Sequence, residues 1–127
     1  MRNAESEPED LRDRTKRFAL RVIRLYKSLR KTGETDVIGR QLLRSGTSVG
    51  AQYREACRAR SAAEFISKIE SATQELSETE YWLELLIEAG LVNPALLQNL
   101  LNEARELTAI FVASANTTKR SARKKEM

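Results

Sequence analysis

The chain has 127 residues, of which 41% are apolar and 31% charged, so it is long enough for one globular domain with a real core. It contains no histidine and a single cysteine, Cys57, which excludes Ser-His-Asp and Cys-His catalysis, His-ligated zinc and an internal disulfide. The net charge is +4, yet residues 12–60 hold 14 Lys or Arg against four acids, whereas residues 61–115 hold two against nine. This polarity suits a polyanion on the basic half or head-to-tail contact between copies of the chain.

Glycine and proline are scarce, and apolar residues recur at a period near 3.6, which predicts an all-α fold. Residues 1–8 show no such periodicity, and we expect a disordered acidic segment there. No apolar run approaches the roughly 18 residues of a membrane span, and the first residues are acidic and polar, unlike a signal peptide. We therefore expect a soluble, cytoplasmic protein.

The first predicted helix runs from about Glu9 to Lys31. Its core positions have the spacing typical of bundle packing: Leu11, Thr15, Phe18, Val22, Leu25 and Leu29. The opposite face is almost free of acids and carries a stripe of cations: Arg14, Arg17, Arg21, Arg24, Lys27 and Lys31. Such a stripe is either a solvated face or a site for anions.

The second predicted helix begins at Thr35 or Asp36 and ends near Ala59 or Arg60. One side carries small residues for close helix packing: Gly39, Gly46, Gly50 and Cys57, the last expected to be buried. The exposed face adds more cations: Arg40, Arg44, Arg54 and Arg58. A polar stripe beside the core predicts a structural motif in which an arginine pairs with a carboxylate of its own or the next helix: Arg44, Ser45, Ser48, Gln52, Glu55 and Glu75.

Ser61 and Glu64 form a capping box that opens the third predicted helix, about Ala62 to Ala89. Its core positions are Phe65, Ile69, Ala72, Leu76, Leu83 and Leu86. Three large apolar side chains project away from that seam and predict a subunit interface: Tyr81, Trp82 and Leu85. The alternative is that they lie along charged neighbours of the same subunit. The carboxylates of this helix have no basic or histidine partner at useful spacing, which indicates a solvated acidic face.

Asn93 and Pro94 begin the fourth predicted helix, which runs to about Ala115. Residues 116–127 carry five Lys or Arg, and we expect a flexible basic tail that binds nucleic acid only weakly. Four helices joined by short turns predict an up-down-up-down antiparallel four-helix bundle over residues 9–115.

Three segments carry a resemblance to a known family. They are Arg-Ser-Gly-Thr-Ser-Val-Gly-Ala-Gln-Tyr-Arg-Glu-Ala at 44–56, Ala-Glu-Phe-Ile-Ser-Lys at 63–68 and Glu-Thr-Glu-Tyr-Trp-Leu at 78–83. The chain resembles, over about residues 12–115, the bacterial four-helix bundle family that includes the 23S rRNA intervening-sequence proteins. Accessory proteins of diversity-generating retroelements are similar at a greater distance. The family usually has asparagine where this chain has Gln52, and the acidic N-terminus and basic tail fall outside the likeness.

The resemblance implies a cytoplasmic bundle that assembles into a ring-like homopentamer, with a basic surface for nucleic acid and no established enzymatic activity. We therefore expect a non-catalytic homo-oligomer, without metal or cofactor, that binds RNA or DNA by neutralising phosphates. The contacting residues are expected on the first two helices: Arg14, Arg17, Arg21, Arg24, Lys27, Lys31, Arg40, Arg54 and Arg58. The alternative is a structural adaptor whose main partner is another protein, such as a nucleic-acid enzyme. An enzyme is the third alternative, but the usual catalytic constellations are missing.

Overall fold

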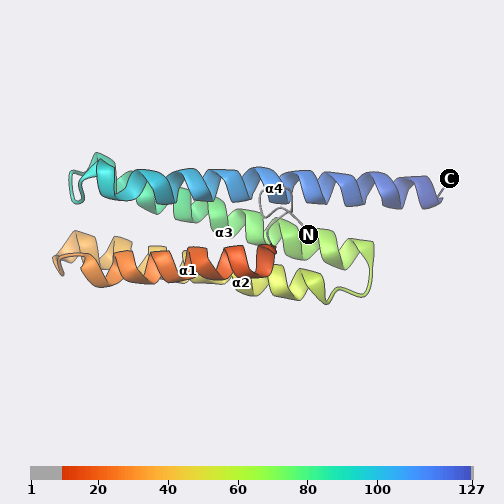
Figure 1. The fold of residues 1–127 in the computed structure, drawn as a ribbon, viewed down its shortest axis with the longest axis horizontal. Coiled ribbons are helices and arrows are strands. Elements are labelled where there is room, and N and C mark those ends of the chain that lie inside the picture. The colour runs from red at the N-terminus through yellow and green to blue at the C-terminus, as the bar shows by residue number, and fades with distance from the viewer. Residues whose placement is uncertain (1–9, 127) are drawn as a thin grey trace, which may run out of the picture.

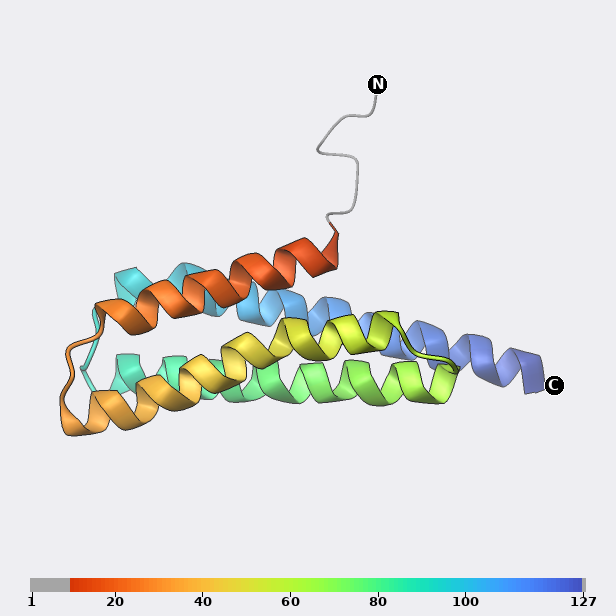
Figure 2. The same cartoon turned by 90° about the horizontal axis from the view of Figure 1, so that it is seen from below.

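The computed structural model describes residues 10–126, which form four helices. They are α1 (Leu11–Ser28), α2 (Gly33–Cys57), α3 (Ala62–Glu88) and α4 (Pro94–Glu126). Each helix runs antiparallel to the one before it (Figures 1 and 2). The predicted four-helix bundle is therefore confirmed. In the described part of the chain, no helix is both long and apolar enough to cross a membrane.

Local signals in the sequence set most of the helix ends. The Asp10 carboxylate accepts a hydrogen bond from the backbone N–H of Arg12 at 2.9 Å and caps α1. The Ser61 hydroxyl accepts one from the N–H of Glu64 at 3.1 Å and caps α3, as the capping box predicts. Gly90, with a φ of 70°, turns the chain after α3, a conformation that residues with a Cβ rarely adopt.

The glycines of α2 allow α1 to approach it closely. A Cβ added at Gly46 would lie 2.7 Å from Val22 Cγ2, and one at Gly50 would lie 3.1 Å from Thr15 Oγ1. The small residues predicted to allow close helix packing therefore lie where α2 contacts α1. Cys57 differs from the prediction, because it sits at the end of α2 and is exposed.

The C-terminal end of α4 also differs from the prediction. The helix continues to Glu126, where the sequence suggests a flexible tail from residue 116. The reason is that residues 116–126 contain neither glycine nor proline, and Ala, Arg and Lys extend a helix that is already nucleated. Cations at a helix C-terminus also interact favourably with the helix dipole. The acidic segment predicted at residues 1–8 lies outside the described residues.

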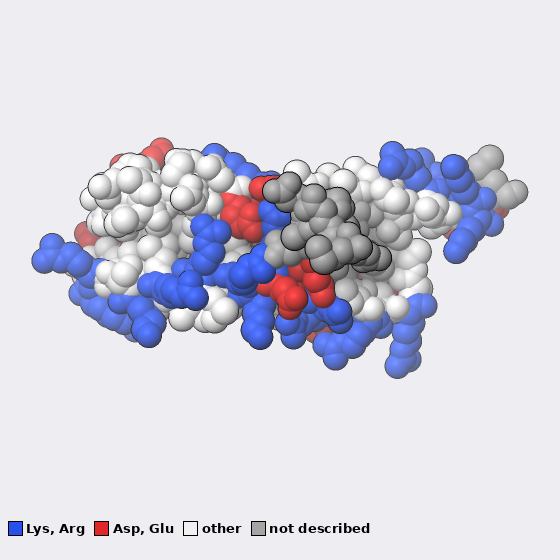
Figure 3. All heavy atoms as spheres, viewed as in Figure 1, with Lys and Arg blue, Asp and Glu red and all other residues white. Residues whose placement is uncertain are grey.

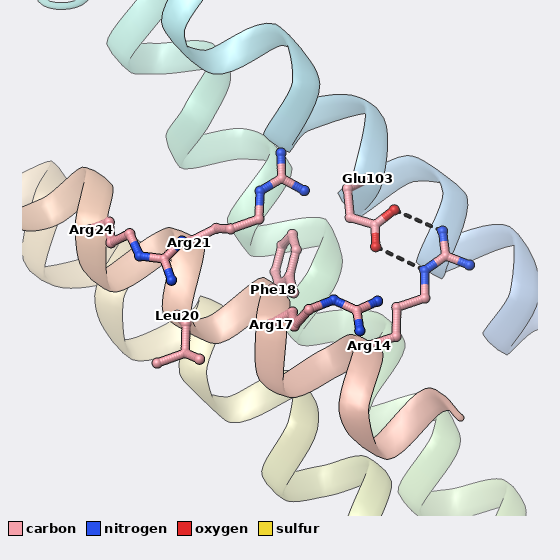
Figure 4. A pocket seen from close by; sticks show the side chains of 7 residues that line it. All are labelled: Arg14, Arg17, Phe18, Leu20, Arg21, Arg24 and Glu103. Carbon is pink, nitrogen blue, oxygen red and sulfur yellow. Dashed lines mark hydrogen bonds and ion pairs between the residues drawn. The ribbon is translucent and has the colours of Figure 1, made fainter. Parts of the chain in front are cut away.

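The bundle is closed unevenly. α2 packs extensively against α1 and α3, and α3 packs against α4, but α1 and α4 meet over only a short stretch. The edge between α1 and α4 is therefore the open side of the bundle, and four arginines of α1 border it, namely Arg14, Arg17, Arg21 and Arg24 (Figure 4).

Candidate nucleic-acid interface

A groove of about 460 Å³ lies where α1 and α4 fail to close. Its lining consists of Arg14, Arg17, Phe18, Leu20, Arg21, Arg24 and Glu103. The four arginines, here called the α1 arginine row, follow one another at helical spacing, and Figure 4 shows the guanidinium of Arg21 reaching toward α4 while Leu20 points the other way. The only carboxylate in this lining is Glu103, so the groove has a net positive charge.

Arg14 and Glu103 join α1 to α4 across this groove. Arg14 Nε donates to Glu103 Oε2 at 2.8 Å and its terminal nitrogen donates to Oε1 at 2.7 Å, a bidentate pair. The side chains are 16% and 17% exposed. Glu106 also lies 3.1 Å from Arg14, but it is 65% exposed. Hydrogen bonds from Arg14 hold the pKa of Glu103 below its ordinary value, and the same bonds raise the pKa of Arg14.

The remaining cations predicted to bind nucleic acid do not gather in the groove. Lys31 lies in the α1–α2 loop, with its ammonium 4.8 Å from the centre of the Tyr26 ring. On α2, Arg40 pairs with Asp36 at 3.2 Å. The other three cations of the prediction are exposed: Lys27, Arg54 and Arg58.

Seen from the side of α1 and α4, the cations form a band over α1 and α2 (Figure 3). A separate group of cations covers the C-terminal end of α4 in the same view. Acids interrupt the band mainly near its middle. The face in this view is therefore rich in positive charge.

The predicted polar motif of α2 joins α2 to α3 at several separate points. Arg44 pairs with Glu75 at 3.3 Å and with Glu78, both on α3, which bears out its expected pairing with a carboxylate. However, Arg44 is 49% exposed, so these are surface pairs rather than a buried one. Further along the same seam, Glu55 pairs with Lys68 at 2.8 Å, and this contact lowers the pKa of Glu55.

The serines and the glutamine of the motif have different surroundings. The buried hydroxyl of Ser45 lies 2.9 Å from that of Thr79 on α3, while Ser48 donates to the carbonyl of Arg44 at 2.7 Å within its own helix. Gln52 is half-buried, and its Oε1 has no hydrogen-bond partner within residues 10–126. No single ligand site is formed by this stripe, which acts as a set of links between two helices.

The three residues predicted to form a subunit interface do not share one environment. Tyr81 is 54% exposed, and its ring meets that of Trp82 edge-on with centroids 5.0 Å apart. Trp82 is half-buried and packs against the core of its own bundle, contrary to the expected projection. It follows Glu78 by one helical turn and Glu75 by two, and both of these pair with Arg44, so Trp82 lies on the side of α3 that faces α2. Leu85 is half-buried. Tyr81 is therefore the one of these three side chains that remains largely exposed.

The fold agrees with two comparisons with known proteins. The sequence profile of the 23S rRNA-intervening sequence proteins matches residues 9–113. The chain belongs to the 23S rRNA-intervening sequence protein family. A crystal structure of a protein of unknown function from the S23 ribosomal protein family of Bacteroides thetaiotaomicron is 39% identical, with a TM-score of 0.78 over 84% of this chain and 98% of that one. A search of curated proteins gives no match.

In this member of the 23S rRNA-intervening sequence family, sequence reasoning overlooked the partners that complete the sites. Glu103 and Glu106 come from α4, 89 and 92 positions after Arg14, and nothing local marks them as its partners. Thr79 faces Ser45 because both lie on core-facing positions of neighbouring helices, a signal that a helical-wheel comparison of α2 and α3 contains.

Proposed function

We propose that this protein is a non-catalytic, cytoplasmic bundle that holds RNA or DNA by its phosphates, with the α1 arginine row as the central contact. The observation that carries the proposal is the groove between α1 and α4, whose lining holds four arginines and one carboxylate. Glu103 neutralises Arg14, which leaves the guanidinium groups of Arg21 and Arg24 at the groove without an ion pair among the described residues. The exposed cations of α2 extend the same positive surface.

The dimensions of the row suit a polyphosphate. From residue 17 to residue 24 the helix rises about 10 Å, a length over which duplex DNA carries roughly six phosphate charges. No base-reading geometry is needed for such contacts, so binding should be independent of sequence and should weaken steeply with salt.

The test is the charge-reversed double variant Arg21→Glu with Arg24→Glu, measured by fluorescence anisotropy on labelled duplex and single-stranded probes of unrelated sequence. Loss of two phosphate contacts should lower affinity at least about 50-fold near 0.1 M salt and reduce the salt slope by about 2. The matched control, Arg21→Lys with Arg24→Lys, keeps the charge and should bind within a few-fold of wild type. Wild-type protein that binds no probe at about 50 mM salt, or binds independently of salt, would refute the proposal.

We also propose that the protein forms a closed homo-oligomer, with five subunits implied by the family resemblance. The support is the exposed Tyr81 on the acidic helix α3, together with the basic surface on the opposite half of the sequence. Mass measurement in solution on wild type, Tyr81→Glu and the control Tyr81→Phe tests it. The expected result is an assembly that Tyr81→Glu dissociates and Tyr81→Phe leaves intact, whereas a wild-type monomer at micromolar concentration would contradict it.

The alternative function is that of an adaptor for another protein, and the same exposed tyrosine favours it. In that case a different protein would cover the Tyr81 face. A monomeric wild type that binds no nucleic acid would make the adaptor the better account.

A further inference from the structure

We propose that the C-terminal end of α4, residues 116–126, is a second phosphate-binding site separate from the α1 arginine row. This segment is called the α4 arm. The inference rests on the proposed function, since both sites take the phosphates of nucleic acid. The profile of the family ends at residue 113, so the arm is a feature that the family match does not cover.

The arm is fixed to the bundle at its root. Ala115 is 4% exposed, and the Lys119 ammonium pairs with Glu70 of α3 at 3.1 Å. One turn further, Ala122 is still half-buried, while residues 123–126 are exposed. In Figures 1 and 2, α4 extends past the α2–α3 loop, so its last turns stand clear of the other helices.

One side of the arm contacts the bundle, so the residues on its opposite side face solvent. Arg120, Arg123 and Lys124 are spaced three and four residues apart, which places them on one face of a helix. Ala122 lies on the opposite side at 100° per residue, so the three cations point away from the bundle. All three are exposed, and none pairs with a carboxylate in the part of the chain that the structure describes.

The charge and composition of the arm favour nucleic acid over other anionic partners. Residues 116–126 hold five Lys or Arg and one carboxylate, a balance of +4, on about 16 Å of helix. The arm has no Trp, Phe, Leu or Ile, the residues by which a basic helix enters a membrane interface. Figure 3 shows the cations of the arm on the same face of the molecule as the band over α1 and α2. Two cationic groups at different ends of one face suit a long polyanion.

The experiment compares the full chain with an arm-neutral variant, Arg120→Gln with Arg123→Gln and Lys124→Gln, which preserves helix propensity. Probes are a DNA duplex, an RNA duplex and a single-stranded RNA, each about 20 nucleotides long, titrated from about 50 to 200 mM salt. Three lost contacts should reduce the salt slope on the duplexes by about 2.7 and lower the affinity at least about 100-fold near 0.1 M salt. The charge-preserving swap Arg120→Lys, Arg123→Lys and Lys124→Arg should bind like wild type.

A second variant tests whether the helix itself matters. Ser121→Pro keeps every charge but interrupts the arm, and it should also lose affinity, because the three cations then no longer share a face. Wild-type affinity and slope in the arm-neutral variant, or in Ser121→Pro, would overturn the proposal. So would arm-dependent binding to anionic lipid vesicles or polyglutamate with nucleic-acid binding unchanged.

The two sites can fail separately. If the arm-neutral variant binds like wild type while the Arg21→Glu, Arg24→Glu variant does not, the α1 row stands and the arm proposal falls. If the arm-neutral variant loses binding while the row variant keeps it, the arm is the site and the proposed role of the α1 row is wrong.

Discussion

Glu103→Gln separates the structural role of the α1–α4 ion pair from the role of the groove in binding. The change keeps the size of the side chain but replaces a carboxylate that accepts two hydrogen bonds from Arg14, at 2.7 and 2.8 Å. Both side chains are less than one-fifth exposed. The pair is therefore neither a surface pair, which contributes about 1 kcal/mol or less, nor a fully buried one, whose disruption costs roughly 3–5 kcal/mol.

An intermediate value of about 2 kcal/mol follows, and for a chain of this length it corresponds to a fall in melting temperature of roughly 6 to 10 °C. Glu106→Gln is the matched control, since it removes the same charge from the same helix at a position that is 65% exposed. That control should lower the melting temperature by no more than about 5 °C, and by less than Glu103→Gln does. Thermal melts at one fixed protein concentration measure both, because the proposed assembly would make the melting temperature depend on concentration.

The pH dependence gives an independent check. The pKa of Glu103 is lowered from its ordinary value of 4.5, so the folded state favours the charged carboxylate. Its contribution to stability is present above about pH 4.5 and is lost as the pH falls through the lower pKa of the folded protein. The difference in stability between wild type and Glu103→Gln should therefore shrink as the pH falls below 4.5.

Nucleic-acid binding should change in the opposite direction. Glu103→Gln leaves Arg14 without its main counter-charge, so the groove gains one positive charge and affinity should rise several-fold at low salt. A melting temperature within about 1 °C of wild type, or a fall no larger than that of Glu106→Gln, would show that the pair does not hold α1 to α4. Reduced affinity in a variant that remains folded would show that the phosphates do not lie in this groove.

Three further outcomes follow from the packing. Gly46→Ala should destabilise the bundle by about 1–2 kcal/mol in thermal unfolding, because the new Cβ would lie 2.7 Å from the branched side chain of Val22. This steric clash outweighs the gain in helix propensity from glycine to alanine. The control Gly33→Ala meets nothing within 4 Å and should be neutral or stabilising, so equal effects would contradict close α1–α2 packing. Arg44→Ala should lower the free energy of unfolding by only about 1 kcal/mol, because Arg44 is 49% exposed. A loss above about 3 kcal/mol would mean that its ion pairs with Glu75 and Glu78 are buried in solution. Absorbance titration should place the pKa of Tyr53 at about 12, raised mainly by burial, and a value near 10 would mean that its ring leaves the stack on Phe111.

Residues close together in the chain determined the helices of this protein. The capping box at Ser61 and Glu64, the Asn93-Pro94 start and the apolar periodicity act within a few residues, so the four helices and their order are readable from the sequence. The glycines of α2 belong to the same class of signal, because three small residues on one helical face leave room for another helix.

Only the tertiary structure decided what the charged and aromatic side chains do. Whether an arginine faces water or a carboxylate depends on which helices are neighbours, as with Arg14 and Glu103, which are 89 positions apart. The residue pattern of one helix does not show how much of its surface a neighbouring helix covers. The sequence therefore did not distinguish Trp82, which packs against the core, from Tyr81, which stays exposed. The α4 arm is helical for the same reason: its composition alone is compatible with disorder, and the helix on which it continues supplies the nucleus that an isolated basic segment lacks.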